Sequence, residues 1–591
     1  MTETDRKPDF VPANRAPEWG SDAMAEVLRD LGIAWMTLNP GASFRGLHDS
    51  IVNHLGNRAP RLLLCLHEEA AVSIAHGYAK VSGRPLAVGL HSNVGLLHGS
   101  MGIFNAWCDR VPMVVIGATG PLDAARRRPW IDWLHTAQDQ GALIRDFIKW
   151  DDQPLSVTAA RRALAEGHAR AMTYPQGPVY VNLDAHLQEA PLEAPPEPLN
   201  LARFAPPALP APDPGALERA TAILAGARAP VIMVGRTGRD AAGWQARIAL
   251  AERLGARVLT DFKTAAAFPT GHPLHAAPSG YFLPPEAQEV LREADAILAL
   301  DWIDLAGCLR AVFGGDTMAT KVIAVSADAT LQRGWGKEAG ALPPADITLA
   351  NSPDAVVPAM LAQLATTPRA VASVSATPPD TPALPADDAL MTPQELAAMV
   401  RAGLAGRTTT LIRAPLSWTG ADWPVDDPLD FLGYDGGGGV GSGPGMAVGA
   451  ALALREAHPG RLPVAVLGDG DFLMNASAVW TAAHANIPLL VVVANNRSFF
   501  NDEVHQEKVA LHRGRPPENR HIGLATDDPD IDIAQVASGH GACGFGPAQN
   551  AGAFRALLAE ALAAVEAGAV AVVDARIAKG YSPAMAAALR G

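Results

Sequence analysis

The residue types best suited to chemistry in this sequence are two oxygen-bearing side chains separated by a glycine turn. Asp469 lies in Gly-Asp-Gly (468–470), and Asn496 is the second residue of an Asn-Asn pair 27 positions later. A carboxylate and a side-chain amide supply the oxygen ligands that Mg²⁺ prefers. A helix that begins at the Gly470 turn would offer backbone N–H groups to an anion. Together these groups predict a diphosphate held by a metal ion.

The elements that must position these groups form a βαβ unit. Short apolar runs at 463–467 and 489–494 predict two buried strands, and the pattern between them predicts a helix at 473–485. Both polar groups then follow the carboxyl ends of strands, where open α/β sheets bind their ligands. The alternative is that both motifs only mark turns in another kind of nucleotide-binding domain.

Gly-Asp-Gly followed at this distance by Asn-Asn resembles the cofactor motif of the thiamine-diphosphate (ThDP) decarboxylases and carboligases, the group of benzoylformate decarboxylase, acetolactate synthase and benzaldehyde lyase. The resemblance implies that Asp469, Asn496 and the main-chain carbonyl of Ser498 hold Mg²⁺. The family often has serine where this chain has Asp471, whose carboxylate would repel a diphosphate unless it points away. The implied cofactor site also includes Gly468, Gly470, Asp471 and Phe472.

Composition limits the classes of function. The chain has 591 residues, 49% of them hydrophobic and 18% charged, and a formal net charge of −14, which argues against nucleic-acid binding. Its four cysteines form no CxxC pair, so we expect free thiols in a reducing compartment. No apolar signal region and no apolar run near the ~20 residues of a membrane span is found, so we expect a cytoplasmic protein with no membrane contact.

Two stretches rich in proline and alanine divide the chain, at 190–215 and 366–388. Each segment that they separate alternates short apolar strands with helical patterns, which predicts an α/β fold of three domains, each a mainly parallel sheet flanked by helices. The ThDP family has this layout. The resemblance implies a pyrimidine-binding domain at 1–190, a linker at 191–215, a central domain at 216–365, a second linker at 366–388 and a diphosphate-binding domain at 389–591.

The N-terminal segment would supply the other half of the cofactor site. A helix is predicted at 21–31 with Ser21 as its N-cap, and a buried strand is predicted at 61–66. His-Glu-Glu and a helix ending in Gly-Tyr-Ala follow, which resembles the family's strand, glutamate and helix. Glu68 stands nine residues before Gly77, where the family has the glutamate that hydrogen-bonds the pyrimidine of ThDP. The alternative, a first-turn acid favoured by the helix dipole, is retained for Glu69.

A predicted strand at 86–90 ends in His91-Ser92. At this place the chain resembles the benzoylformate decarboxylase branch more than the acetolactate synthase branch, which has Gly-Pro-Gly. The resemblance implies that His91 donates and accepts protons above the cofactor, a role for a group that titrates near neutrality. A substrate-contacting serine of that branch falls at Ala42, so the contact is missing unless Ser43 replaces it.

Other residues of the implied site lie in three loops. His135 and Gln138 belong to the loop that borders the active site in the family, and Phe499, Glu503 and His505 follow the Asn-Asn pair. In the glycine-rich stretch 434–450, Gly439 and Val440 match the family positions beneath ThDP, with Val440 as the hydrophobic residue that bends the cofactor. Loop 301–304 of the central segment carries two carboxylates, which suit a flavin diphosphate poorly, so we expect no FAD.

The function implied is that of a ThDP- and Mg²⁺-dependent enzyme that makes or breaks a C–C bond next to a carbonyl. Its substrate would be a small carbonyl compound: a 2-keto acid, an aldehyde or an acyloin. The two halves of the cofactor site meet across subunits in this family, which implies at least a homodimer and often a homotetramer. Two alternatives stay open, an acetolactate synthase-like carboligase and a non-catalytic protein with the ThDP fold.

Overall fold

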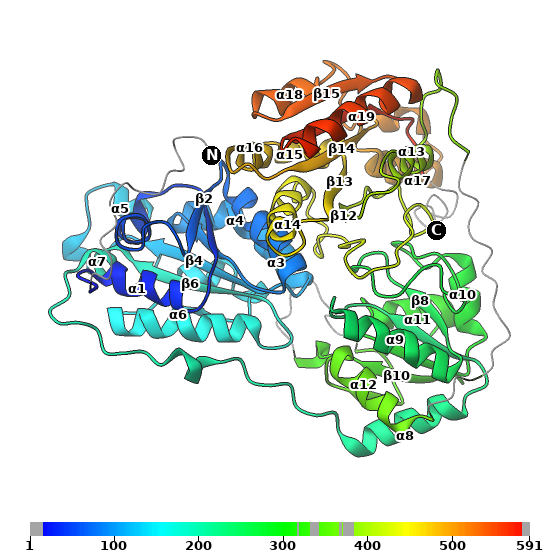
Figure 1. Ribbon diagram of the computed structural model, residues 1–591, viewed down its shortest axis with the longest axis horizontal. Helices are drawn as coiled ribbons and strands as arrows, with labels where there is room; N and C mark the ends of the chain where they lie inside the picture. The colour runs from blue at the N-terminus through cyan, green and yellow to red at the C-terminus, as the bar shows by residue number, and fades with distance from the viewer. Residues whose placement is uncertain (1–15, 316–317, 331–341, 366–368, 370–382, 582–591) are drawn as a thin grey trace.

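Three parallel sheets, each flanked by helices, make up the computed structural model of the protein (Figure 1). This confirms the predicted α/β fold of three domains. Most of the predicted second linker lies outside the described residues. The structure describes residues 16–315, 318–330, 342–365, 369 and 383–581.

The N-terminal domain is built on a six-stranded sheet. Its strand order is β2 (Arg61–Leu64), β1 (Trp35–Leu38), β3 (Ala87–Leu90), β4 (Met113–Thr119), β6 (Pro178–Asp184) and β5 (Asp151–Asp152). Its helices are α1 (Gly20–Asp30), α2 (Arg45–Asp49), α3 (Glu68–Ser82), α4 (Ser92–Cys108), α5 (Ile131–Leu134), α6 (Val157–Met172) and α7 (Ala185–Glu189). Strands β1, β3, β4 and β6 are buried along their whole length, as expected for parallel strands covered on both faces.

The central domain has a five-stranded sheet in the order β11 (Ile347–Leu349), β10 (Lys321–Val325), β9 (Ala296–Leu300), β7 (Pro230–Val234) and β8 (Arg257–Thr260). Its helices are α8 (Pro214–Gly226), α9 (Ala241–Leu254), α10 (Pro285–Arg292), α11 (Leu305–Phe313) and α12 (Pro353–Gln363). Residues 191–213 run along the outside of the molecule from the N-terminal domain to α8 (Figure 1). Asp301 forms a buried ion pair with Arg110 of the N-terminal domain, and Asp304 caps α11, so both carboxylates of this loop have structural partners.

The C-terminal domain has a five-stranded sheet in the order β12 (Thr409–Arg413), β13 (Leu462–Gly468), β14 (Leu489–Asn495), β16 (Val570–Arg576) and β15 (Cys543–Ala548). Its helices are α13 (Pro393–Gly403), α14 (Gly443–Ala457), α15 (Asp469–Met474), α16 (Ser477–His484), α17 (Phe500–His512), α18 (Ile533–Gly539) and α19 (Ala551–Glu566). The strands that flank the Gly-Asp-Gly motif are therefore direct neighbours in the sheet.

Helices α3 and α14 join the N-terminal and C-terminal domains (Figure 1). A Cβ added to Gly77 would collide with the Met446 carbonyl, and one added to Gly449 would collide with the Ile74 carbonyl. The two helix backbones therefore approach as closely as only glycine allows. Around them, apolar side chains of both domains form one continuous core, which includes Val72 and Val448.

Two local predictions were wrong. Ser21 is not the N-cap of α1: it lies inside the helix, where its hydroxyl accepts a hydrogen bond from Ser50, and Asp22 accepts the N–H groups of residues 18 and 19 instead. The predicted helix at 473–485 is two helices, α15 and α16, separated at Asn475 and Ala476. In the described part of the chain, no helix is both long enough and apolar enough to span a membrane.

Candidate active site

Asp469 and Asn496 are brought together by neighbouring strands. Asp469 directly follows β13 and Asn496 directly follows β14, and Gly468 is paired with Ala494 in the register of these strands. The Ser498 N–H donates to Asp469 Oδ2 at 3.1 Å and to Asn496 Oδ1 at 2.9 Å. The side chains that were predicted to bind a metal thus converge on one point at the carboxyl edge of the sheet.

A cavity of about 170 Å³ opens beside these groups. Asp469, Asn496, Ser498 and the Gly468–Asp471 turn line it, together with Val440 and Phe499. A Cβ added to Gly470 would lie 2.7 Å from the Phe499 ring, so the ring would have to move to admit it. The donor set is rich in oxygen, which fits Mg²⁺, and the backbone at the start of α15 fits an anionic diphosphate.

Burial raises the pKa of Asp469 to about 6, because an ionised carboxylate loses water when it is enclosed. The N–H groups of Gly470 and Ser498 oppose this effect only in part. A bound cation would favour the ionised form of Asp469. Its attraction to the carboxylate would offset the desolvation that raises the pKa.

The Asp471 carboxylate is bound by backbone groups of the glycine-rich loop. Its Oδ1 accepts the N–H groups of Gly441 at 2.7 Å and Gly443 at 3.2 Å, and Arg413 lies 3.7 Å from its Oδ2. These contacts compensate the negative charge that departs from the family pattern. Arg413 also pairs with the buried Asp435 at 2.9 Å, so one arginine holds both carboxylates in place.

The glycine-rich loop packs on the N-terminal domain as well as on the cavity. Gly439 exchanges hydrogen bonds with the Asn105 side chain of α4, and a Cβ on Gly439 would collide with Met101. Gly441 has φ +102°, a conformation that favours glycine. The side chain of Val440, between these glycines, lies at the cavity wall and is 36% exposed.

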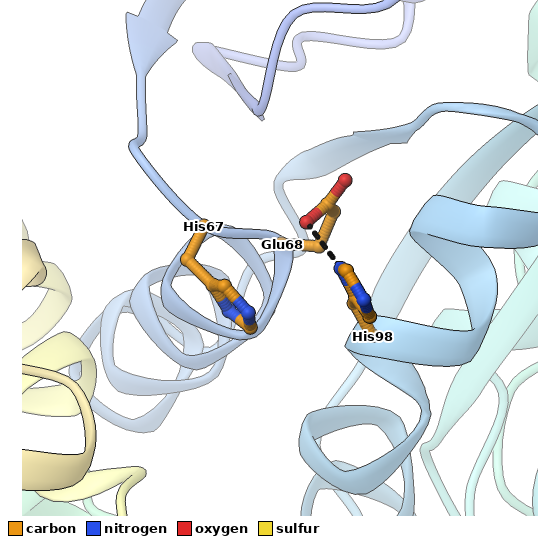
Figure 2. Close-up of side chains that lie close together, drawn as sticks. All are labelled: His67, Glu68 and His98. Carbon is orange, nitrogen blue, oxygen red and sulfur yellow. Dashed lines mark hydrogen bonds and ion pairs between the residues drawn. The ribbon is translucent and has the colours of Figure 1, made fainter.

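Glu68 begins α3, and its carboxylate is held by the first turns of α4. The side chain is 9% exposed, and its Oε2 lies 3.2 Å from Nδ1 of His98, whose side chain is 61% exposed (Figure 2). The neighbouring Glu69 has a different environment. Burial, followed by the Asp471 carboxylate, raises the pKa of Glu69. Of the two adjacent acids, only Glu68 has a titratable partner within hydrogen-bonding distance.

His91 contacts Ser43 and His135 in a second group of polar side chains on the N-terminal domain. Its Nδ1 lies 2.9 Å from the Ser43 hydroxyl, and its ring meets the His135 ring edge to face at 4.7 Å. Burial, followed by the nearby His135, lowers the pKa of His91. Gly41 is required beside it, because an added Cβ would collide with the imidazole. Ser43, next to Ala42, is therefore the residue that bonds the imidazole.

The remaining predicted site residues lie apart from the cavity. Phe472 is fully buried in the core shared by α3 and α14, and Gln138 and His505 are exposed outside the cavity lining. Glu503 is buried and bound by Lys579 at 2.6 Å and by the Ser498 hydroxyl; although burial opposes it, these bonds lower the pKa of Glu503. Glu503 therefore supports the loop of Ser498.

Sequence reasoning missed several residues of the site. Arg413 ends β12, next to β13, and its place at a strand end after an apolar run was an available signal. Tyr434, Asn501 and Tyr581 also line the cavity. The partner of Glu68, His98, lies three residues after Gly95 on α4 and carries no sequence signal of its own.

Neither Glu68 nor His91 is among the described residues that line the cavity. One chain thus carries an oxygen-lined cavity on its C-terminal domain and a carboxylate and histidine cluster on its N-terminal domain. This arrangement defines a three-domain α/β enzyme whose cofactor would have to contact two separate half-sites.

Three models of protein families match the chain, and all describe thiamine pyrophosphate (TPP, another name for ThDP) enzymes. The N-terminal TPP binding domain matches residues 18–143, the central domain matches residues 217–328, and the C-terminal TPP binding domain matches residues 416–575. The chain belongs to the thiamine pyrophosphate enzyme family, as predicted. It is a ThDP-dependent enzyme that acts on a C–C bond next to a carbonyl.

Known proteins are similar over most of the chain. A benzoylformate decarboxylase of Pseudomonas aeruginosa is 26% identical over 488 residues, 81% of this chain and 86% of its own length. The large subunit of acetolactate synthase isozyme 1 of Escherichia coli is 24% identical over 88% of each chain. The ThDP-dependent 4-hydroxybenzoylformate decarboxylase of Rhodococcus jostii RHA1 has the same fold, with a TM-score of 0.76 at 23% identity, over 95% of this chain and 100% of that chain.

Proposed function

We propose that the protein is a Mg²⁺- and ThDP-dependent decarboxylase of 2-keto acids, with ligation or cleavage of acyloins and benzoins as related reactions. The observation that carries this proposal is the Ser43–His91–His135 cluster next to Glu68. Decarboxylation leaves a carbanion that must be protonated, and a histidine beside the reacting carbon can deliver that proton. The similarity to a benzoylformate decarboxylase supports the same branch.

Asp469, Asn496 and the Ser498 carbonyl would hold Mg²⁺, and the start of α15 would bind the diphosphate. Bound ThDP supplies an electron sink for the bond that breaks. Val440 and Gly439 would support its ring from below. Glu68 would hold and move the proton at the pyrimidine nitrogen, and its burial excludes water from that hydrogen bond.

His91 would exchange a proton with the reacting carbon of the substrate. Ser43 orients the imidazole through Nδ1, and the His135 ring packs against it in a T-shaped arrangement. Phe499 would border the substrate from the C-terminal domain, since its ring lies at the cavity and is 40% exposed. The remaining substrate candidates, Gln138, Glu503 and His505, have weaker support because they lie off the cavity or are already paired.

A homodimer at least, with a homotetramer as the family's common form, would complete each site. One exposed apolar side chain lies next to each half-site: Leu97 is 54% exposed beside His98, and Met474 is 59% exposed at the end of α15. Contact with a second copy would remove their apolar surface from water. A second copy of the chain, placing its N-terminal cluster on this cavity, would cover both.

Three further proposals complete the assignment. The first is the set of predicted domain boundaries, with domains at 1–190, 216–365 and 389–591 joined by linkers at 191–215 and 366–388. A flavin is not required, because the Asp301 carboxylate and its partner Arg110 occupy the strand end where a flavin diphosphate would need free cations. A cytoplasmic location is supported by the four cysteines, which form no disulfide with one another.

The proposed function is tested by a substrate screen of the enzyme reconstituted with ThDP and Mg²⁺. Release of CO₂ from aromatic and aliphatic 2-keto acids is compared with formation of acetolactate from pyruvate and cleavage of benzoins. Release of CO₂ and the corresponding aldehyde supports the proposal. Acetolactate as the main product would favour the synthase alternative, which is supported by the similarity to the E. coli subunit.

A further inference from the structure

Lys80 joins the N-terminal domain to the glycine-rich loop of the C-terminal domain, residues 434–443. Its side chain lies near the end of α3 and is 1% exposed. The ammonium donates hydrogen bonds to the main-chain carbonyl of Tyr434 and to Asp109 Oδ2, each at 2.5 Å. Tyr434 lines the cavity proposed for ThDP, and the same loop carries Val440 to the wall of that cavity. A buried ammonium therefore holds the start of the loop that borders the cavity.

Asp109, the partner of Lys80, is fixed at the end of α4. It directly follows this helix, and its Oδ2 also lies 2.8 Å from Nε2 of the buried His76. Although burial opposes it, the charge of Lys80 and the hydrogen bond with His76 lower the pKa of Asp109. The carboxylate is therefore ionised and keeps the ammonium in place.

The glycine-rich loop also contacts α4 directly. A Cβ added to Gly436 would lie 2.6 Å from the backbone nitrogen of Asp109. Gly439 exchanges hydrogen bonds with the Asn105 side chain, which is four residues before Asp109 and on the same face of the helix end. The loop is thus held at residues 434, 436 and 439, and Lys80 makes the first of these contacts.

We propose that Lys80 is a positioning residue for the cofactor cavity and acts through its bond to the Tyr434 carbonyl. This rests on the proposed function, in which Gly439 and Val440 support ThDP. Five of the six residues at 436–441 are glycine, so the backbone of the loop can adopt many conformations unless its ends are held. Lys80 itself is not among the described residues that line the cavity, so its effect is carried by the loop.

The alternative is that Lys80 serves only to neutralise Asp109. Loss of the ammonium alone would leave a buried carboxylate short of its partner and would destabilise the whole protein. The double variant Lys80→Met with Asp109→Asn removes both charges, so no buried charge is left unpaired, but the Tyr434 carbonyl still lacks this donor. The two explanations therefore make opposite predictions for the loop in the double variant.

Hydrogen exchange in the apoprotein tests the loop without cofactor or turnover. In the double variant, the N–H groups of Gly438, Gly439 and Gly441 are expected to exchange about tenfold or more faster than in the wild type, because their hydrogen bonds depend on the position of the loop. The N–H groups of β13 should keep their wild-type rates. Unchanged exchange in the loop, or an equal rise in the loop and in β13, would overturn the proposal.

Affinity for ThDP, measured by fluorescence titration of the full chain with Mg²⁺, tests the consequence for the cavity. The double variant is expected to bind ThDP about tenfold or more weakly than the wild type at a similar melting temperature. Lys149→Met is the matched control, since Lys149 is a half-buried lysine of the same domain that also donates to main-chain carbonyls, those of Arg170 and Thr173. A double variant with wild-type affinity would overturn the positioning role alone. If the wild type binds no ThDP, the proposed function has failed and the role of Lys80 fails with it.

Discussion

Asp469 and Asn496 accept hydrogen bonds from the same donor, the backbone N–H of Ser498, at 3.1 and 2.9 Å. The two side-chain oxygens are therefore oriented before any cation binds. A metal held by Asp469 and Asn496 would contact a carboxylate and an amide whose rotamers are already fixed. Pre-organisation of this kind lowers the entropic cost of binding.

Asp469→Ala is expected to lose Mg²⁺-dependent ThDP binding. Without the carboxylate, the cation has one charged ligand fewer, and the diphosphate keeps its negative charge unshielded. The loss should be at least about 10-fold in ThDP affinity, measured by fluorescence or circular dichroism in a magnesium titration. Asp388→Ala, an exposed aspartate, is the control. Equal affinities in the two variants would contradict the metal role of Asp469.

Metal binding should weaken as the pH falls through about 6, the pKa of the buried Asp469. Because the pKa of Asp469 is raised above the ordinary carboxyl value, the apoprotein holds the protonated form below about pH 6, and the stability that the raised pKa contributes is lost as the pH rises through 6. Metal binding releases the proton and is favoured above that pH. Titration of apoprotein with Mn²⁺, followed by EPR without ThDP, measures this directly; a constant affinity from pH 5 to 7 would refute it.

Mixed dimers test whether each site is shared between subunits. Glu68→Gln alone should lower kcat by about 100-fold or more, as expected for loss of a positioned proton-transfer group. When Glu68→Gln and Asp469→Ala chains are refolded or co-expressed together, a heterodimer has one intact site if the half-sites meet across chains, so about a quarter of the wild-type activity should return. No recovery in a verified heterodimer would place both halves of the site within one chain.

His91→Ala should lower kcat while ThDP affinity stays unchanged, because an interaction made only in the transition state is removed. The wild-type rate should carry an ionisation below the ordinary histidine value, since burial, followed by His135, lowers the pKa of His91. Ser43→Ala should move this ionisation without abolishing activity. A pH profile that is identical in the wild type and His91→Ala would leave His91 a packed residue at a strand end.

Glu69→Gln should stabilise the protein at neutral pH. Burial and the nearby Asp471 raise the pKa of Glu69, so its ionised form costs stability above the ordinary carboxyl range. We expect a melting temperature about 1 to 3 °C higher than that of the wild type at pH 7. The difference should vanish as the pH falls and Glu69 becomes protonated, and a lower melting temperature at pH 7 would contradict this explanation.

The C-terminal half of the site could be predicted because each of its polar residues directly follows, in the sequence, the strand that positions it. The strands β13 and β14 are uninterrupted apolar runs, and the polar groups directly follow them, so the parallel pairing alone brings Asp469 next to Asn496. Phe472, which the same local reading assigned to the cofactor site, is fully buried in the core and does not line the cavity. The helical phase of α15 turns its ring into the core, and phase within a short helix is set by packing.

Contacts between elements distant in the chain were not predictable. The pairing of Glu68 with His98 depends on how the starts of α3 and α4 are rotated toward each other, and the hold of Arg413 on Asp471 depends on the sheet order. Neither relation leaves a spacing in the sequence. Ser43 and His91 could each be proposed from the sequence as a site residue, but their hydrogen bond could not be predicted.

The close packing of α3 on α14 at their glycines also affects the order in which the domains can finish folding during synthesis. Helix α3 is made early, but the surface that covers it is made only when residues 443–457 leave the ribosome. Until then the N-terminal domain exposes an apolar helix face that water destabilises and that other chains can bind. The first domain to be translated is thus among the last to be completed, and the nascent chain depends on protection from aggregation over most of its length.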